Sequence, residues 1–166
     1  MRVVIRGAGD LASGVALRLW RAGMDVVLLD VEKPTAIRRT VAFSEAIVHG
    51  KQTVEDVTAK LAAAETAEET LAAGMIPVLV DPEGRSIPTL RPDALVDAIL
   101  AKRNLGTKIT DAPVVIGVGP GFTAGVDCHA VVETMRGHTL GRVIYEGSAL
   151  PNTNIPGLIG GYAGER

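Results

Sequence analysis

The feature that most constrains the fold is a glycine-rich turn near the amino terminus. Residues 3–5 are β-branched and predict a strand buried on both faces, and the turn at residues 7–12 (GAGDLA) follows directly. Apolar residues then recur at helical spacing up to Gly23, and residues 26–29 predict a second buried strand that ends at Asp30. A strand, a glycine turn, a helix and another strand in this order form the start of a β-α-β unit.

The turn has the G-x-G-x-x-A spacing of a phosphate-binding loop. Gly7 allows a tight turn, Gly9 lets a ligand approach the backbone, and Ala12 lets the helix pack closely on the strand. The free amides and the positive dipole at the helix start attract anions. Asp30 is placed to accept a hydrogen bond from a ribose hydroxyl. We therefore expect a nucleotide or another phosphate-bearing cofactor at these residues, together with Asp10.

A purely structural role for the same residues stays open. The glycines would then serve only the turn, and Asp30 would only end a strand. Asp10 favours this alternative, because its charge lies inside the loop and opposes a pyrophosphate unless it points away or holds a cation.

The rest of the chain predicts a mostly parallel sheet. Further strands are expected at residues 76–80, 114–116, 130–132 and 142–145. Three segments are ambiguous: 40–43 (short strand), 54–59 (edge strand or start of an alanine-rich helix) and 94–101 (helix or strand). The prediction is an α/β, Rossmann-like three-layer fold over residues 1–150. Residues 151–166, rich in glycine and proline, are expected to connect to a carboxyl-terminal segment absent from this sequence.

A second glycine-rich loop follows the strand expected at residues 114–116. Its backbone at Gly119, Gly121 and Phe122 is a candidate anion-binding site, and the two loops are expected to line one crevice. Asp127 and His129 follow within reach of one ligand and are the candidate catalytic residues, with His129 as a hydrogen-bond donor or proton shuttle. The alternative is a rigid turn with a solvated histidine.

Basic pairs in two predicted loops are candidates for neutralising the ligand. They are Arg38 with Arg39, and Lys102 with Arg103. At the carboxyl edge of a sheet they could clamp a phosphate or a carboxylate, although a solvated surface charge is the more common role of such pairs.

Composition excludes several classes of function. A formal net charge of −2 and five scattered aromatic residues argue against nucleic-acid binding. The single cysteine, Cys128, cannot form an internal disulfide, and no signal peptide or membrane-length apolar window is found, so we expect a cytoplasmic protein without membrane contact. Three histidines and one cysteine give no metal-ligand spacing, so no metal site is expected.

Five segments carry a resemblance to a known family: residues 4–14, 35–46, 97–104, 119–125 and 129–138. Together they resemble the YqeB-type accessory proteins of selenium-dependent molybdenum hydroxylase systems, which are related in their Rossmann portion to the XdhC-type maturation factors of xanthine dehydrogenase. The resemblance implies handling of the molybdenum cofactor, or of its sulfur or selenium ligand, before insertion into a hydroxylase. It implies a molybdopterin-type cofactor, which carries a phosphate often extended to a dinucleotide. It assigns no catalytic residue.

The sequence thus favours an accessory protein that binds a phosphate-bearing cofactor, with a molybdenum hydroxylase as partner. Two alternatives remain: an NAD(P)-dependent oxidoreductase domain, and a non-catalytic Rossmann scaffold that binds only the partner hydroxylase. The oxidoreductase lacks a second substrate domain and a Lys or Tyr proton donor beside the loop. Whether the chain is an enzyme or a homo-oligomer is left open.

Overall fold

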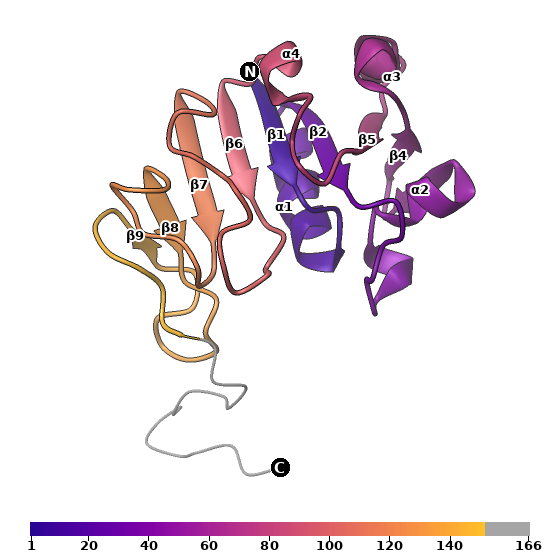
Figure 1. Ribbon diagram of the computed structural model, residues 1–166. Helices are drawn as coiled ribbons and strands as arrows, with labels where there is room; N and C mark the ends of the chain where they lie inside the picture. Colours follow the sequence, from indigo (N-terminus) through magenta and orange to yellow (C-terminus); the bar gives the residue numbers. More distant parts are fainter. Residues whose placement is uncertain (152–166) are drawn as a thin grey trace.

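The computed structural model describes residues 1–151, and its centre is a nine-stranded sheet with short helices on both faces (Figure 1). The strands are β1 (Arg2–Arg6), β2 (Asp25–Asp30), β3 (Lys51–Val54), β4 (Val57–Leu61), β5 (Ile76–Val80), β6 (Ala94–Asp97), β7 (Val114–Val118), β8 (Ala130–Val132) and β9 (Val143–Ile144). The helices are α1 (Asp10–Arg21), α2 (Glu45–His49), α3 (Ala67–Ala72) and α4 (Ile87–Leu90), with 3-10 turns η1 (Arg39–Val41) and η2 (Ala64–Thr66).

The strand order confirms the predicted α/β class and the mostly parallel sheet. The order is β3-β4-β5-β2-β1-β6-β7-β8-β9, and every neighbouring pair from β4 to β8 is parallel. Only the edge strands β3 and β9 run antiparallel to their neighbours. The six strands from β5 to β8 follow the 3-2-1-4-5-6 order of the Rossmann fold.

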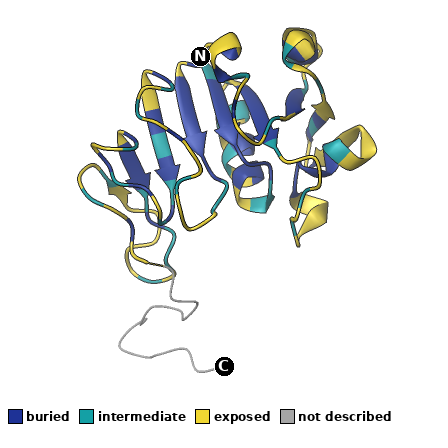
Figure 2. Ribbon diagram, viewed as in Figure 1, coloured by how far each residue is buried: buried dark blue, intermediate teal, exposed yellow. Residues whose placement is uncertain are grey.

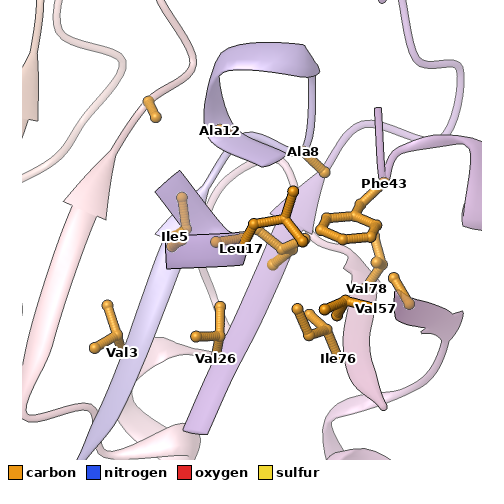
Figure 3. Close-up of a cluster of buried hydrophobic side chains, with 14 of the residues drawn as sticks. Val3, Ile5, Ala8, Ala12, Leu17, Val26, Phe43, Val57, Ile76 and Val78 are labelled. Carbon is orange, nitrogen blue, oxygen red and sulfur yellow. The ribbon is translucent and has the colours of Figure 1, made fainter. Parts of the chain in front are cut away.

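Two apolar clusters cover the two faces of the sheet. Side chains alternate along each strand, so Val3 and Ile5 of β1 face one cluster and Val4 faces the other. The first cluster packs under α1 and α2, where Leu17 and Phe43 meet the strands (Figure 3). The second cluster packs under α3, α4 and the irregular connections that follow β6 and β7. The result is the three-layer arrangement expected for parallel strands buried on both faces.

The ambiguous segments resolve through long-range packing. Residues 94–97 form β6 in the centre of the sheet, with all four side chains buried. The segment around residues 40–43 is not a strand but η1 followed by α2, because the fully buried Phe43 side chain anchors this turn in the first cluster. The expected edge strand is the hairpin β3–β4, which turns at Glu55 and buries Val54 and Val57.

Two further expectations concern the connector at residues 151–166 and the absence of a membrane-spanning segment. The expected connector at residues 151–166 lies outside the described residues, apart from Pro151. Within residues 1–151, no helix is long and apolar enough to span a lipid bilayer.

Candidate functional site

A cleft of about 630 Å³ opens at the carboxyl ends of β1 and β6. It lies where the chain order of the sheet reverses, since β2 follows β1 on one side and β7 follows β6 on the other. Ligands of open parallel sheets bind at such a position. The cleft is lined by Gly7, Gly9, Asp10, Leu11, Ala12, Asp30, Val31, Thr35, Ala36, Ile37, Arg38, Ala98, Ile99 and Leu100.

Gly7 and Gly9 have different surroundings, so a side chain would have different effects at the two positions. Gly7 has φ +100°, and a Cβ there would lie 2.8 Å from the carbonyl oxygen of Ala98, so the fold itself requires glycine at this close approach to β6. Gly9 has φ −65°, which any residue adopts, and a Cβ there would meet no atom within 4 Å. The fold therefore does not require glycine at position 9, and the space beside it belongs to the cleft.

The amino terminus of α1 faces the cleft without a side-chain cap. Gly9 is its N-cap residue, and the first amide to bond within the helix is that of Ser13, which donates to the Gly9 carbonyl at 2.8 Å. The amides of Asp10, Leu11 and Ala12 precede this bond, and all three residues line the cleft. Uncapped amides at the positive end of a helix dipole form a site for an anion.

Asp30 holds the glycine loop with its carboxylate. It accepts hydrogen bonds from the Ala8 amide at 2.8 Å and the Val31 amide at 2.7 Å. Burial raises the pKa of Asp30 above its usual value, and the two amide bonds oppose this rise. The Ala8 amide is therefore satisfied by the protein itself, which leaves the amides of the first turn of α1, beside Gly9, as the candidate anion site.

The Ala8 carbonyl is also satisfied within the protein. It accepts hydrogen bonds from the Ser13 hydroxyl at 3.1 Å and from the Ser44 amide at 2.9 Å. The Ser13 hydroxyl in turn accepts the Phe43 amide at 2.8 Å. Ser13 and Ser44 thus tie the glycine loop to α2, a role that the sequence analysis missed because the partners lie about thirty residues apart.

The four candidate basic residues divide into one at the cleft and three away from it. Arg38 lines the cleft and forms an ion pair with Asp10 at its mouth. Arg39 instead pairs with Glu45 of α2 at 2.8 Å. Lys102 and Arg103 are exposed, follow Leu100 in the connection after β6, and are not among the residues that line the cleft.

The second glycine loop packs against protein rather than facing the cleft. A Cβ at Gly121 would lie 2.6 Å from the Cα of Arg103, and one at Gly119 would lie 2.9 Å from the Thr134 hydroxyl. Phe122 is buried in the second cluster, and its ring fills the space beside Gly117. These glycines let neighbouring segments approach closely, and the two glycine loops do not line one crevice.

Asp127 and His129 lie away from the cleft. The Nδ1 atom of His129 accepts the Val115 amide at 2.9 Å, and its own amide donates to the Val115 carbonyl at 2.8 Å. Val115 is near the start of β7, so His129 lies at the amino edge of the sheet, opposite the cleft. Asp127 accepts the Thr123 amide at 2.8 Å within its own turn. The structure does not bring either residue to the glycine loop.

Apolar residues that the sequence analysis did not select form walls of the cleft. Val31 and Ile37 follow β2, and Ile99 and Leu100 follow β6. The Ile37 side chain is 96% exposed, which is unusual for a large aliphatic residue. The sequence could have indicated these residues, because they follow predicted strands and the carboxyl ends of neighbouring parallel strands meet at one edge of the sheet. Within residues 1–151 no group of three His, Cys, Asp or Glu side chains is arranged to hold a metal ion.

A comparison with known proteins finds a similar protein in Escherichia coli. The chain is 59% identical over 165 residues, 99% of its length, to the Escherichia coli (strain K12) protein described as uncharacterized protein YqeB. The match shows that this chain is similar to part of YqeB. The chain spans 30% of the length of this relative, and no family model matches it.

Proposed function

We propose that this chain binds a phosphate-bearing cofactor or nucleotide, as the cofactor-handling part of a YqeB-type accessory protein. The observation that carries the proposal is the open space beside Gly9, in front of the uncapped start of α1, at the point where the strand order reverses. This combination of backbone amides, helix dipole and sheet position suits an anionic ligand.

Different residues that line the cleft suit different parts of the proposed ligand. A phosphoryl group fits at Gly9 and the amides of the first turn of α1, with Arg38 beside it to neutralise charge. The Asp30 carboxylate keeps lone pairs to accept a ligand hydroxyl, and Val31 and Leu100 offer apolar surface to a planar ring. The volume lies within the roughly 300–1,000 Å³ typical of small-molecule sites.

The resemblance to selenium-dependent molybdenum hydroxylase systems narrows the proposed ligand to a molybdopterin-type cofactor or its dinucleotide. Maturation of a molybdenum hydroxylase, contact with that enzyme and a cytoplasmic location are part of the same proposal. They rest on the resemblance, since the printed name of the Escherichia coli relative gives no activity.

The cleft favours binding over hydride transfer. Among the described residues that line it there is no Lys, Tyr, His or Cys, so none of these offers the proton donor that an NAD(P)-dependent oxidoreductase needs beside its nicotinamide. Binding without chemistry by this chain is therefore the better reading of the cleft.

Native mass spectrometry with molybdopterin cytosine dinucleotide, NAD and CTP tests the proposal. We expect one of these to form a one-to-one complex that Gly9→Val weakens at least tenfold, because a Cβ at this position meets no protein atom within 4 Å and the side chain then occupies space proposed for the ligand. Gly14→Val is the matched control. Gly14 is an exposed glycine of α1 away from the cleft, and a Cβ there also meets no atom within 4 Å.

Two outcomes would contradict the proposal. A complex that Gly9→Val leaves unchanged would place the ligand elsewhere. No complex with any of the three compounds, together with capture of a molybdenum hydroxylase by the chain, would favour the scaffold alternative.

A further inference from the structure

Among residues 1–151, no helix covers one face of the β7–β9 part of the sheet, and this face carries apolar side chains (Figure 1). Val114, Ile116 and Val118 point to the same face of β7, because side chains alternate along a strand. Val118 is paired with Val132 of β8, and Val132 with Val143 of β9, so these side chains continue the row across three strands. These five residues are called the β7–β9 face below.

The row is exposed at its two ends and packed in its middle, because Ile116 and Val118 contact the first cluster. Val114 is 41% exposed and Val143 is 45% exposed, and the other three are partly buried. Figure 2 shows exposed residues at the start of β7 and on β9, in contrast to the buried central strands. Large aliphatic side chains gathered on one exposed surface mark a site of contact with another part of a protein.

Chain connectivity explains why no connection between the described strands β6, β7 and β8 crosses this face. Parallel strands are joined by right-handed crossovers, so the β6–β7 and β7–β8 connections both pass over the same face of the sheet. They pass over the other face, where Ala112, Phe122 and Cys128 pack with Val115 and Val131 in the second cluster. The helices gather instead at the β1–β5 part of the sheet (Figure 1).

Exposed aliphatic side chains on a face of parallel strands are unusual. β7 and β8 are parallel, and parallel strands are almost always covered on both sides. The Escherichia coli relative has more than enough additional chain to supply a cover, because the 165 matched residues are only 30% of its length. We propose that, in a YqeB-type protein, polypeptide outside the matched segment packs on the β7–β9 face. This inference does not depend on the ligand proposed for the cleft.

Thiol labelling compares this chain with the full-length Escherichia coli relative. Val143→Cys and Val114→Cys are made in this chain and at the equivalent positions of the relative, and maleimide modification of each site is followed by peptide mass spectrometry. Val48→Cys, on α2 and 53% exposed, is the control. The native Cys128 is fully buried and adds little background.

We expect both face positions to react about as fast as the control in this chain. In the full-length relative we expect them to react at least tenfold more slowly than in this chain, at concentrations where light scattering shows a monomer. Fast labelling in both proteins would overturn the proposal, because the face would then stay open. Slow labelling of this chain, or protection that disappears on dilution of either protein, would also overturn it by assigning the face to a second copy.

Discussion

At the level of single residues, Asp10 and Arg38 decide how much charge the cleft offers a ligand. Arg38 is the one basic residue among the described residues that line the cleft, and its guanidinium is engaged by the Asp10 carboxylate. Asp10 also lies in the first turn of α1, where it competes with an incoming anion for the same positive dipole. An anionic ligand must therefore displace Asp10 from Arg38 or share the guanidinium with it.

Removing the Asp10 charge should strengthen binding of a phosphate-bearing ligand. We expect Asp10→Asn to raise the affinity about fivefold at low salt, and Arg38→Ala to lower it by a similar factor, from the usual size of helix-terminus and surface charge effects. Titration calorimetry with the compound that forms the complex measures both changes. Asp25→Asn, an exposed aspartate at the opposite end of β2, is the control.

An affinity that falls in Asp10→Asn would mean that Asp10 contacts the ligand directly, for example through a hydroxyl or a bound cation. An unchanged affinity in both Asp10→Asn and Arg38→Ala would mean that the phosphate lies away from the mouth of the cleft.

At the level of elements, the connection after β6 is held by a buried polar network rather than by a helix. The side chain of Arg6, 2% exposed, donates to the Thr107 hydroxyl at 2.6 Å and to the carbonyls of Pro82 and Leu105. The Thr107 hydroxyl donates to Asp97 at 2.6 Å, which links the buried guanidinium to the buried carboxylate. Ile99 and Leu100 lie in this connection, so the network also positions one wall of the cleft.

Thr107→Val keeps the shape of the side chain but removes the hydroxyl between two buried charges. We expect it to lower the free energy of unfolding by about 2 kcal/mol, because an unsatisfied buried hydrogen-bonding group costs roughly 1–3 kcal/mol. Urea denaturation measures the change. Thr110→Val, at an exposed threonine of the same connection, should change it by less than about 0.5 kcal/mol. Equal effects of the two substitutions would contradict a special role of the network.

The sequence was sufficient for the elements whose signals are local. The β1–α1–β2 unit was predicted because a β-branched run, a glycine turn and helical spacing follow one another directly. The cleft residues that belong to this unit were predicted with it, and Asp30 was placed correctly at the end of β2. Its hydrogen bond to the Ala8 amide was not foreseen, because the sequence does not show which acceptor a buried loop amide finds.

The roles of the second glycine loop and of His129 could not be derived from local sequence. Gly121 is required by the backbone of Arg103, and His129 is fixed by Val115 at the start of the neighbouring strand. These contacts join segments that periodicity treats as independent. A glycine that serves packing and a glycine that serves a ligand have the same sequence pattern, and only the neighbouring atoms distinguish them.

At the level of the whole molecule, the two parts of the sheet have unequal protection. The β1–β5 part is covered by helices on both faces, whereas the β7–β9 part has irregular connections on one face and, on the other, a row of apolar side chains that is exposed at Val114 and Val143. The edge strand β9 has only two residues. Local opening should therefore cost less free energy in the β7–β9 part.

Hydrogen–deuterium exchange followed by mass spectrometry tests this difference. In this chain we expect the amides of β7 and β8 to exchange at least tenfold faster than those of β1 and β2. In the full-length Escherichia coli relative we expect a smaller difference between these exchange rates, because additional polypeptide would cover the β7–β9 face. Uniform exchange across the sheet in this chain would show that the open face costs no stability.

The double attachment of Ala8 has a consequence for the speed of ligand capture. Its amide is bound by Asp30, and its carbonyl by Ser13 and Ser44, so the conformation of the loop is already fixed before any ligand arrives. The entropy of ordering this loop is then lost when the chain folds rather than at association. A ligand of the proposed kind would then meet a preformed loop, and we expect its on-rate to be limited by diffusion and charge rather than by rearrangement of the turn.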